Sequence, residues 1–319
     1  RNARLIEPRL LEISRTGALG PWPFRTYSTL VRYRMIAVDL DGTLLDSRGR
    51  VSDANAAALQ RAHDAGALVV PCTGRGWRES HSALGVFAHN GTAPGVFVGG
   101  ALVSDFVTGE PLEIAALEPT LAMRIVEHLF DQPEALLLYR SAHHVGHDYL
   151  VTGTGALSAN TRWWFEATEA LVHENREPTL EDMHHTMRVG LVATEDRMAQ
   201  IIRLVREAFH DDEAFVHAFG GVTEAVVERA IHVLEVFAPN VDKWRGLSWL
   251  ARQHGIESAE VAVIGDQIND IAMVREAGCG VAMANAVPAL RDIADRHTGH
   301  CNESGVAQAI DALLSGQWD

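Results

Sequence analysis

The chain contains almost no lysine. Of its 27 lysine and arginine residues only Lys243 is a lysine, and it lies in the stretch VDKWRG. A bias in composition can produce a general preference for arginine. Such a bias does not explain why one position keeps an ammonium group, so we ask which residues the Lys243 side chain interacts with.

Cysteine and long apolar runs are also scarce, which excludes several classes of protein. Cys72, Cys279 and Cys301 are odd in number and widely spaced, so they fit neither a disulfide framework nor a zinc-binding pattern. We therefore expect a reducing, cytoplasmic environment. No apolar run approaches the ~20 residues that span a bilayer, and we expect no membrane partner.

Acidic residues outnumber basic residues in this chain. The formal net charge is −15, which argues against nucleic acid as a partner, because a nucleic-acid surface needs clustered positive charge. A small anionic substrate is still compatible, since a local cationic pocket can lie inside an acidic protein. We make no prediction of the oligomeric state.

The first 34 residues differ from the rest of the chain. They are rich in arginine, contain Gly20, Pro21 and Pro23, and lack the continuous apolar core of a secretory signal. Glu7 and Glu12 weaken an interpretation as an arginine-rich targeting peptide. We interpret residues 1–34 as an N-terminal extension that is either disordered or not native, and Met35 as the beginning of the fold.

From Met35 onward, short apolar runs alternate with amphipathic segments. Ser52 can cap the first helix and Gly66 can end it. Strands alternating with helices predict an α/β fold with a parallel sheet that helices cover on both faces. In such sheets ligands bind beyond the carboxyl ends of the strands. We expect strands at 35–40, 67–74, 95–100, 232–238, 261–266 and 280–283, and helices at 53–65, 243–255 and 268–278.

The middle of the chain has a different pattern. Amphipathic helices are expected at 121–130 and 198–209, with strands at 135–139 and 187–193 beside them. An insertion of this kind is most simply a second domain carried on two linkers. We therefore expect a core domain in two parts, 35–113 and 232–319, and an inserted α/β cap domain at 114–231.

Polar residues follow four of the expected strands. If these strands are parallel neighbours, their side chains converge at one edge of the sheet. The four stretches supply Asp39, Asp41 and Thr43 in DLDGT, Thr73, Gly74 and Arg75 in CTGR, Lys243 in DKW, and Asp266, Asn269 and Asp270 in GDQIND.

Such convergence brings several carboxylates into one small site. Two unit charges ~4 Å apart interact by ~4 kcal/mol at an effective dielectric of 20. A divalent cation with oxygen ligands, together with one ammonium group, would balance this charge. Mg²⁺ is the expected cofactor, because it accepts a few carboxylates and commonly bridges to a substrate phosphate. Lys243 would then supply a compact charge that holds phosphate oxygens without the two-pronged geometry of arginine.

Phosphoryl transfer assigns a task to each side chain. Asp39 could attack phosphorus and form an aspartyl phosphate, and Asp41 could protonate the leaving oxygen and then deprotonate water. Thr73, Gly74 and Asn269 could donate to phosphate oxygens. Asp266 would bind the metal, and Asp270 and Thr43 would hold the site in place from behind.

The motifs resemble a known family. DLDGTLL, CTGR, the lone lysine and GDQINDIAMV…AGCGVAMANA are similar to the four ordered motifs of the haloacid dehalogenase-like phosphohydrolases, most closely the Cof-type or sugar-phosphatase branch. The resemblance covers Met35 to about Leu314, and in the insertion it rests on length and pattern alone. It implies a Rossmann-like, doubly wound core with a larger α/β cap between the second and third motifs.

The resemblance also implies a set of site residues. Asp39 and Asp41 would be nucleophile and acid/base, and Mg²⁺ would bind the Asp39 side chain, the Asp41 main-chain carbonyl and Asp266. Phosphate would contact Leu40, Thr73, Gly74, Lys243 and Asn269. Two positions depart from the family pattern: Gly99-Gly100 stands where Asn-Gly is common, and Trp244 stands where glycine often follows the lysine.

Several of these features also have simpler interpretations. An isolated Asp-x-Asp is usually a turn, a lone lysine is usually solvated, and Asp242 and Arg245 are expected to be surface charges. His143, His144 and His147 fit an exposed cap loop better than a metal site. Trp163 and Trp164 fit packing or helix docking better than substrate stacking, and Cys72 fits a buried small hydrophobe.

The sequence therefore predicts a Mg²⁺-dependent phosphatase that acts on a small phosphorylated metabolite, most simply a sugar phosphate. The closest alternative is a phosphomutase, which keeps both aspartates of the first motif. An alternative of another class is a phosphate-ligand sensor without turnover, whose expected mark would be loss of Asp39, Asp41 or Lys243. All three are present.

Overall fold

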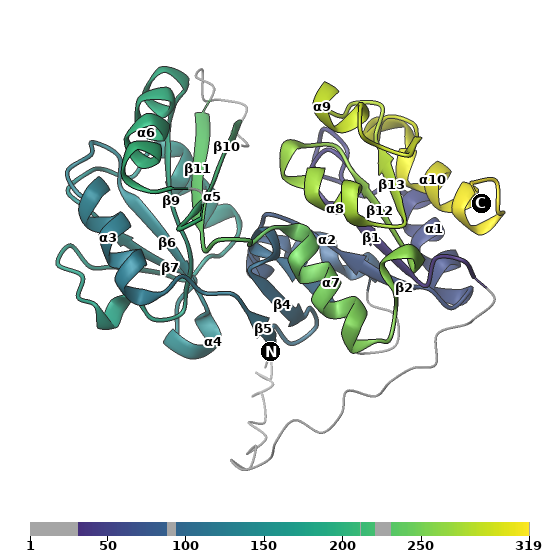
Figure 1. Cartoon of the computed structure of the whole chain (residues 1–319), viewed down its shortest axis with the longest axis horizontal. Coiled ribbons are helices and arrows are strands. Elements are labelled where there is room, and N and C mark those ends of the chain that lie inside the picture. The colour runs from purple at the N-terminus through teal and green to yellow at the C-terminus, as the bar shows by residue number, and fades with distance from the viewer. Residues whose placement is uncertain (1–30, 88–93, 211, 221–230, 319) are drawn as a thin grey trace, which may run out of the picture.

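The computed structural model describes residues 31–87, 94–210, 212–220 and 231–318. Most of the N-terminal extension, residues 1–30, lies outside the described residues. The described chain forms two lobes, each built around a sheet (Figure 1). Within the described part, no helix is both long enough and apolar enough to cross a membrane.

The first lobe contains a parallel sheet with the strand order β14-β13-β12-β1-β2. Figure 1 shows α1 and α10 on one side of this sheet and α7 and α8 on the other, so the expected doubly wound α/β core is confirmed. The strands are β1 Met35–Val38, β2 Leu68–Pro71, β12 Val261–Gly265, β13 Cys279–Ala282 and β14 Arg296–His297. The helices of this lobe are α1 Asp53–Asp64, α2 Trp77–Leu84, α7 Lys243–Gln253, α8 Ile271–Glu276, α9 Pro288–Arg291 and α10 Gly305–Leu314.

Helix α1 begins and ends as its sequence predicts. The Ser52 side chain accepts a hydrogen bond from the Asn55 amide at 3.2 Å, which satisfies one of the free amides of the first turn. Gly66 follows the helix with φ of 94°, a left-handed conformation that favours glycine. One polar and one conformational signal therefore fix the two ends of this helix.

A small antiparallel sheet, β3-β4-β5, lies beside β2. Its strands are β3 Pro94–Phe97, β4 Leu102–Asp105 and β5 Pro111–Ile114. The strand expected at 95–100 is shorter than predicted, because the chain turns at Val98–Gly100. Gly99 and Gly100 both have positive φ, at 62° and 100°, so the double glycine permits this turn.

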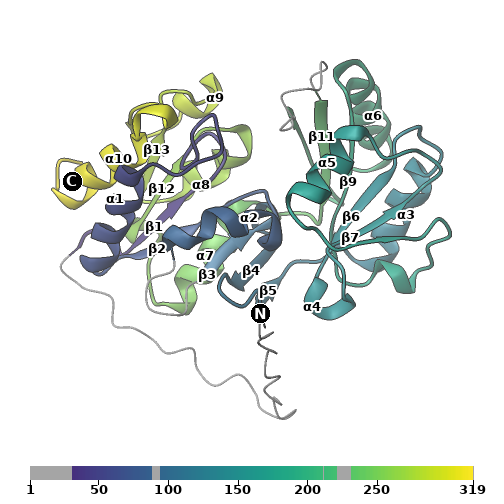
Figure 2. The ribbon, with the colours of Figure 1, turned by 180° about the vertical axis from the view of Figure 1, so that it is seen from behind.

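The second lobe contains a six-stranded sheet in the order β10-β11-β9-β6-β7-β8. Helices α3 and α6 cover its outer face, and the opposite face is turned toward the first lobe (Figures 1 and 2). The strands are β6 Leu136–Arg140, β7 Tyr149–Thr152, β8 Val172–Glu174, β9 Thr186–Thr194, β10 Phe215–Gly220 and β11 Ile231–Phe237. The helices are α3 Pro119–Leu129, α4 Ala142–Val145, α5 Ala159–Ala167 and α6 Glu195–Ala208.

One expected strand belongs to the other lobe. The segment 232–238 was predicted to return to the parallel sheet, but β11 pairs antiparallel with β9 and β10 in the six-stranded sheet. Leu234 and Val236 pack into the core under α3 and α6, while Glu235 and Phe237 face the first lobe. Because both faces of β11 are covered, its sequence has the apolar character of a parallel strand. The division into domains stays a prediction, and its second boundary is better placed after Phe237 than at 231/232.

Candidate active site

Asp39 directly follows β1, and the side chain of Lys243 reaches it from α7. The Asp39 amide donates to the carbonyl of Ile264 on β12 at 3.0 Å, so the sheet ladder fixes this position. Lys243 Nζ lies 2.6 Å from Asp39 Oδ1 and 2.5 Å from Asp270 Oδ1. The lone lysine is thus not a solvated surface residue, because it is only 1 % exposed.

Lys243 is placed by a helix start and not by the end of a parallel strand, which corrects the sequence prediction. Asp242 caps α7 by accepting from the Arg245 amide at 2.8 Å. The helix start lies against the Gly100 turn: a Cβ atom on Gly100 would lie 1.8 Å from the Asp242 carbonyl oxygen. The double glycine therefore also permits the close approach that brings Lys243 into the site.

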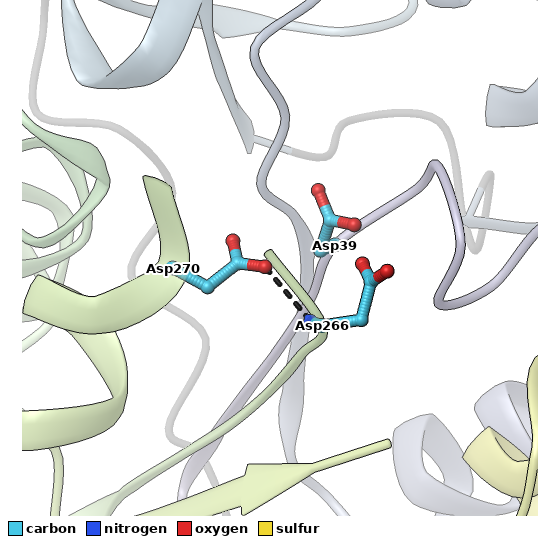
Figure 3. Close-up of side chains that lie close together, drawn as sticks. All are labelled: Asp39, Asp266 and Asp270. Carbon is cyan, nitrogen blue, oxygen red and sulfur yellow. Dashed lines mark hydrogen bonds between the residues drawn. The ribbon is translucent and has the colours of Figure 1, made fainter. Parts of the chain in front are cut away.

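Asp270 holds the loop after β12. Its Oδ2 accepts from the amides of Asp266 and Gln267, both at 2.9 Å, and its Oδ1 accepts from Lys243. Figure 3 shows the bond to the Asp266 amide and the carboxylates of Asp39 and Asp266 close by. Both Asp270 oxygens are therefore engaged by the protein, and this carboxylate fixes the backbone of the loop that carries Asp266 and Gln267.

Asp266 is oriented by two side chains and one glycine. Its Oδ1 accepts from the Thr43 hydroxyl at 3.1 Å, and its Oδ2 accepts from Asn285 Nδ2 at 3.3 Å. Gly42 has φ of 76°, and a Cβ atom there would lie 2.4 Å from Asp266 Oδ2. The DLDGT turn therefore requires glycine beside the Asp266 carboxylate.

The three carboxylates of Asp39, Asp266 and Asp270 carry an electrostatic cost. One oxygen from each lies within 4.8 Å of the others. Burial raises the pKa of Asp39 well above its usual range, opposed by Lys243 and reinforced by Asp270 and Asp266. Burial, reinforced by the Asp270 carboxylate, raises the pKa of Asp266 to about 7. Burial alone would lower the pKa of Lys243, but the carboxylates of Asp270 and Asp39 outweigh burial and raise this pKa above the ordinary lysine value.

These residues fit a divalent cation with oxygen ligands. A carboxylate with a pKa near neutrality is one whose negative charge lacks a partner, and Lys243 alone does not balance three of them. Asp39 and Asp266 both keep an oxygen that accepts no more than a weak hydrogen bond, whereas the two Asp270 oxygens accept three hydrogen bonds between them. The donor set is all oxygen, which suits Mg²⁺.

Asp41 lies near Asp39, but its side chain is directed elsewhere. Arg75 donates two hydrogen bonds to the Asp41 carboxylate: Nε donates to Oδ2 at 2.7 Å, and Nη2 donates to Oδ1. The Asp41 side chain keeps 43 % of its surface exposed. Asp39 and Asp41 thus have separate environments, as expected for two carboxylates with different tasks.

The predicted phosphate-contacting residues lie around the same opening. Thr73 follows β2 and is 1 % exposed, and its amide donates to Val96 at 2.9 Å. Thr73, Gly74 and Asn269 all line the cavity described below, and the Asn269 Oδ1 is buried without a hydrogen-bond partner. The side chain of Leu40 is buried, so only its backbone can meet a ligand.

A cavity of about 240 Å³ lies between these residues and the second lobe. Asp39, Asp41 and Arg75 line one side, and side chains of the six-stranded sheet and α5 line the other, among them Trp164 and Val192. Figure 2 shows α2 of the first lobe between the parallel sheet and the second lobe. A molecule that fills this cavity would therefore touch both lobes.

Buried polar contacts join the two lobes at the cavity wall. Glu79 on α2 accepts from the Tyr149 hydroxyl at 2.5 Å and from Trp164 Nε1 at 2.9 Å. Arg188 on β9 donates to the Gly74 carbonyl at 3.0 Å and pairs with Glu235 on β11. The second lobe is thus attached directly to the loop that carries Thr73 and Gly74.

The simpler interpretations have mixed outcomes. Cys72 is a buried small side chain, and burial raises the pKa of its thiol. His143 and His144 are exposed, but they lie on the helix α4 and not in a loop, and His147, just after α4, is partly buried. Trp164 docks the second lobe on the first, and it also lines the cavity. Asp242 and Arg245 are not simple surface charges, because Asp242 caps α7 and Arg245 pairs with Glu113 at 2.6 Å.

Sequence reasoning assigned no role to Arg75, Glu79 or Asn285. Arg75 follows Thr73-Gly74 directly, so its place in the motif was a usable signal. Asn285 lies in the stretch GVAMANAVPAL and donates to the Gly42 carbonyl at 2.7 Å, across 243 positions of sequence. Glu79 has a local partner in the Gly76 amide, which donates to its Oε2 at 2.6 Å at the start of α2. Its two partners from the inserted segment, Tyr149 and Trp164, have no signal in the sequence around Glu79.

Comparisons with known proteins agree with this geometry. A family model described as haloacid dehalogenase-like hydrolase matches residues 36–310. The Bacillus subtilis (strain 168) protein YxeH is 30 % identical over 287 residues, which are 88 % of this chain and 98 % of that protein. The 5-amino-6-(5-phospho-D-ribitylamino)uracil phosphatase YwtE of the same organism is 28 % identical, over 89 % of this chain and 99 % of its own.

A solved structure shares the fold. A haloacid dehalogenase-like hydrolase from Bacteroides thetaiotaomicron superposes with a TM-score of 0.70 at 23 % identity, covering 88 % of this chain and 99 % of that one. The resemblance inferred from the four motifs and the expected fold are both confirmed. The chain belongs to the haloacid dehalogenase-like hydrolase family.

Proposed function

We propose that this chain is a Mg²⁺-dependent phosphatase that hydrolyses a small phosphomonoester through an aspartyl phosphate on Asp39. The observation that carries the proposal is that Asp39 and Asp41 line the same cavity, while Lys243 and Asp266 lie behind Asp39. A nucleophile, an acid/base and a cationic site thus meet around the space for one small molecule.

The reaction divides into two steps. In the first, an Asp39 oxygen forms a bond to phosphorus while the bond from phosphorus to the leaving oxygen breaks, and Asp41 gives that oxygen a proton. In the second, water attacks the phosphorus of the aspartyl phosphate, Asp41 takes the proton of the water, and the Asp39 carboxylate is released with inorganic phosphate. Asp41 thereby returns to its starting protonation state.

The other side chains stabilise charge. Lys243 neutralises Asp39 as it approaches the phosphate anion, and Thr73, Gly74 and Asn269 donate to the phosphate oxygens. When bound by Asp39, Asp266 and the Asp41 main-chain carbonyl, Mg²⁺ supplies positive charge that polarises the phosphoryl group. Thr43 and Asp270 keep the ligands in place.

The substrate is proposed to be a small phosphorylated metabolite, most simply a sugar or sugar-alcohol phosphate. The cavity of about 240 Å³ leaves room for a small leaving group only. Thr161 and Glu235 on its wall can bond hydroxyl groups. Two relatives are named for a ribityl phosphate compound and for phosphoglycolate, both of them small phosphomonoesters.

The test compares wild type, Asp39→Asn and Asp41→Asn in the hydrolysis of p-nitrophenyl phosphate, followed by a panel of phosphorylated metabolites. We expect Asp39→Asn to lose at least about a thousandfold in kcat, because it removes the attacking oxygen. The exposed Asp311→Asn is the matched control. Equal rates in all four proteins would end the assignment.

Two further measurements complete the test. EDTA should abolish turnover and excess Mg²⁺ should restore it, whereas full turnover in chelator would remove the metal from the proposal. Phosphorus NMR on the best metabolite separates release of inorganic phosphate, which we expect, from formation of an isomeric phosphate, which would indicate a phosphomutase.

A further inference from the structure

The Arg75–Asp41 pair is unusual among the ion pairs of the described residues, because it connects the expected acid/base to a residue that also touches the other lobe. Arg75 uses two of its nitrogens on the two Asp41 oxygens, and its Nη1 donates to the Glu79 carbonyl at 3.3 Å. Its Cζ lies 5.1 Å from the ring centre of Trp164, which comes from α5 of the second lobe.

Each of these contacts restricts the guanidinium plane. A fork of two parallel bonds fixes the rotation of the carboxylate as well as its position. A stacked aromatic ring then limits the tilt of the guanidinium itself. Trp164 is held in turn, since its Nε1 donates to Glu79 Oε1 at 2.9 Å. The Asp41 carboxyl group is therefore oriented through Arg75 by a ring from the second lobe.

The fork leaves Asp41 available for chemistry. A carboxylate has about four acceptor sites, two on each oxygen, and the fork uses one on each. The remaining sites belong to a side chain that is 43 % exposed, next to the cavity. Arg75 itself is only 16 % exposed in its side chain, so the pair is shielded on the Arg75 side and open on the Asp41 side.

We propose that Arg75 is a positioning residue that aims Asp41 at the leaving oxygen, and that Trp164 makes this aim depend on the second lobe being closed over the cavity. The inference rests on the proposed function, because it takes Asp41 as the proton donor. It adds that the donor is assembled from both lobes, so that proton transfer becomes efficient only when the substrate is enclosed.

Leaving-group basicity gives a readout that a merely structural role would not move. p-Nitrophenyl, phenyl and benzyl phosphate each carry one aromatic ring, but their leaving oxyanions become more basic in that order. Phenol has a pKa of about 10, as tyrosine does, whereas nitrophenolate leaves readily without a proton. Loss of proton donation should therefore reduce kcat/KM least for p-nitrophenyl phosphate and most for benzyl phosphate.

The experiment measures kcat/KM on the three esters, because this constant reports only the steps through leaving-group release. For Arg75→Ala we expect a loss that is at least about tenfold larger for benzyl than for p-nitrophenyl phosphate. Arg75→Lys should show most of the same difference between the two esters, since an ammonium group keeps the positive charge but cannot form the two parallel hydrogen bonds. Trp164→Leu should show the same order at about threefold to tenfold, and Trp163→Leu should not.

Two controls separate positioning from other roles. Arg61→Ala removes an exposed arginine that pairs with Asp311 at 2.6 Å, and it should leave the ester ratios at the wild-type values. In the double variant Asp41→Asn/Arg75→Ala, the benzyl phosphate constant should be no lower than in Asp41→Asn alone, because Arg75 acts through Asp41. Thermal melting of each variant identifies any that fails to fold, and Arg75→Lys then stands in for Arg75→Ala.

The outcomes are distinguishable. If wild type hydrolyses none of the esters or metabolites, the proposed function fails. If wild type is active but Arg75→Ala loses equally on all three esters, and the loss multiplies with that of Asp41→Asn, then Arg75 contacts the phosphate directly and the positioning proposal is overturned. An unchanged ester ratio in Trp164→Leu would overturn the dependence on the second lobe.

Discussion

The ammonium nitrogen of Lys243 lies 2.6 Å from Asp39 Oδ1, although 204 positions separate the two residues. The same nitrogen lies 2.5 Å from Asp270. Lys243 is one of the largest fully buried side chains of the described residues, and a guanidinium has more atoms and more donors to accommodate. The space between two carboxylates thus gives a physical reason why this position keeps a lysine in a chain that otherwise uses arginine.

Replacing Lys243 by methionine should affect both activity and stability. We expect the phosphatase rate to fall by at least about a hundredfold, as for loss of another charge-stabilising group. Removal of one partner from a buried ionic cluster typically costs about 3–5 kcal/mol in the free energy of unfolding. Arg245→Met, two residues further along α7 and paired with a Glu113 side chain that is 30 % exposed, is the control, with an expected cost of about 1 kcal/mol or less. Similar stabilities and rates for the two variants would contradict this account of Lys243.

The pKa of Asp266 makes the effect of Mg²⁺ depend on pH. Burial and Asp270 raise this pKa to about 7 in the folded protein, against about 3.9 in an unfolded chain. The folded state therefore binds the proton more tightly, so the stability from this group is present below about pH 4 and is lost as the pH rises toward 7. A cation that takes the place of the proton should then stabilise the protein more at about pH 8 than at about pH 5.5.

Melting temperatures with and without Mg²⁺ measure this effect across the same pH range. Below about pH 7, at least one proton must leave for each cation bound, because the pKa of Asp39 is raised as well, so the apparent affinity should fall at least about tenfold per pH unit. Asp266→Asn should remove most of the Mg²⁺-induced shift at every pH. A shift of the same size at acid and alkaline pH would show that Asp266 is not the group that exchanges a proton for the cation.

Much of the fold could be predicted because the signals are local. Ser52 and Gly66 set the ends of α1, and the apolar runs of β1, β2 and β12 are typical of buried parallel strands. The meeting of Asp39 with Asp266 follows from the same rule, since the carboxyl ends of neighbouring parallel strands lie at one edge. The placement of β11 could not be predicted, because a strand covered on both faces has the same pattern in either lobe.

Contacts between side chains far apart in the sequence, within the first lobe and between the two lobes, were the main omission in the site. Lys243 was expected at the end of a parallel strand, and it reaches Asp39 from the start of α7 instead. Glu79 and Trp164 meet across the junction of the two lobes, and no periodicity within either segment reports such a meeting. Arg75 was visible in the motif, but its partner Asp41 lies 34 positions earlier and has no spacing rule that links the two.

The Gly99-Gly100 turn offers a matched pair of substitutions. A Cβ atom on Gly100 would lie 1.8 Å from the Asp242 carbonyl oxygen, whereas one on Gly99 would meet the Phe237 ring at 3.2 Å. Gly100→Ala should therefore displace the start of α7, destabilise the protein by several kcal/mol and lower activity through Lys243. Gly99→Asn should be far milder, at about 1 kcal/mol or less, because asparagine tolerates the left-handed conformation.

Chemical denaturation and activity assays check this pair. The expected order is wild type, Gly99→Asn and then Gly100→Ala in both stability and kcat. If Gly100→Ala folds with the stability and activity of wild type, α7 does not depend on the close approach at Gly100. That result would also mean that the double glycine is not needed to place Lys243 in the site.

The buried pair of Arg188 and Glu235 supports a last prediction, which concerns the wall of the cavity. Burial raises the pKa of Glu235, and Arg188 opposes that rise. Arg188→Met removes the opposing charge, so the folded pKa of Glu235 should rise further above its unfolded value of about 4.3. A carboxyl group of this kind contributes stability below its unfolded pKa and loses that contribution as the pH rises through its folded pKa.

Arg188→Met should therefore be most destabilising at neutral and alkaline pH, by about 3–5 kcal/mol, and least near about pH 4. Adding Glu235→Gln removes the unpaired charge and should recover most of the loss at neutral pH. The control is Arg78→Met, at the edge of the same junction. Arg78 Nε lies 2.9 Å from Asp148 Oδ2, and the Arg78 side chain is 31 % exposed. Urea unfolding at several pH values measures all four proteins. Arg188 also donates to the Gly74 carbonyl at 3.0 Å and to the Tyr149 hydroxyl at 2.8 Å. A loss in Arg188→Met that is independent of pH would mean that these hydrogen bonds, and not the charge, stabilise the cavity wall.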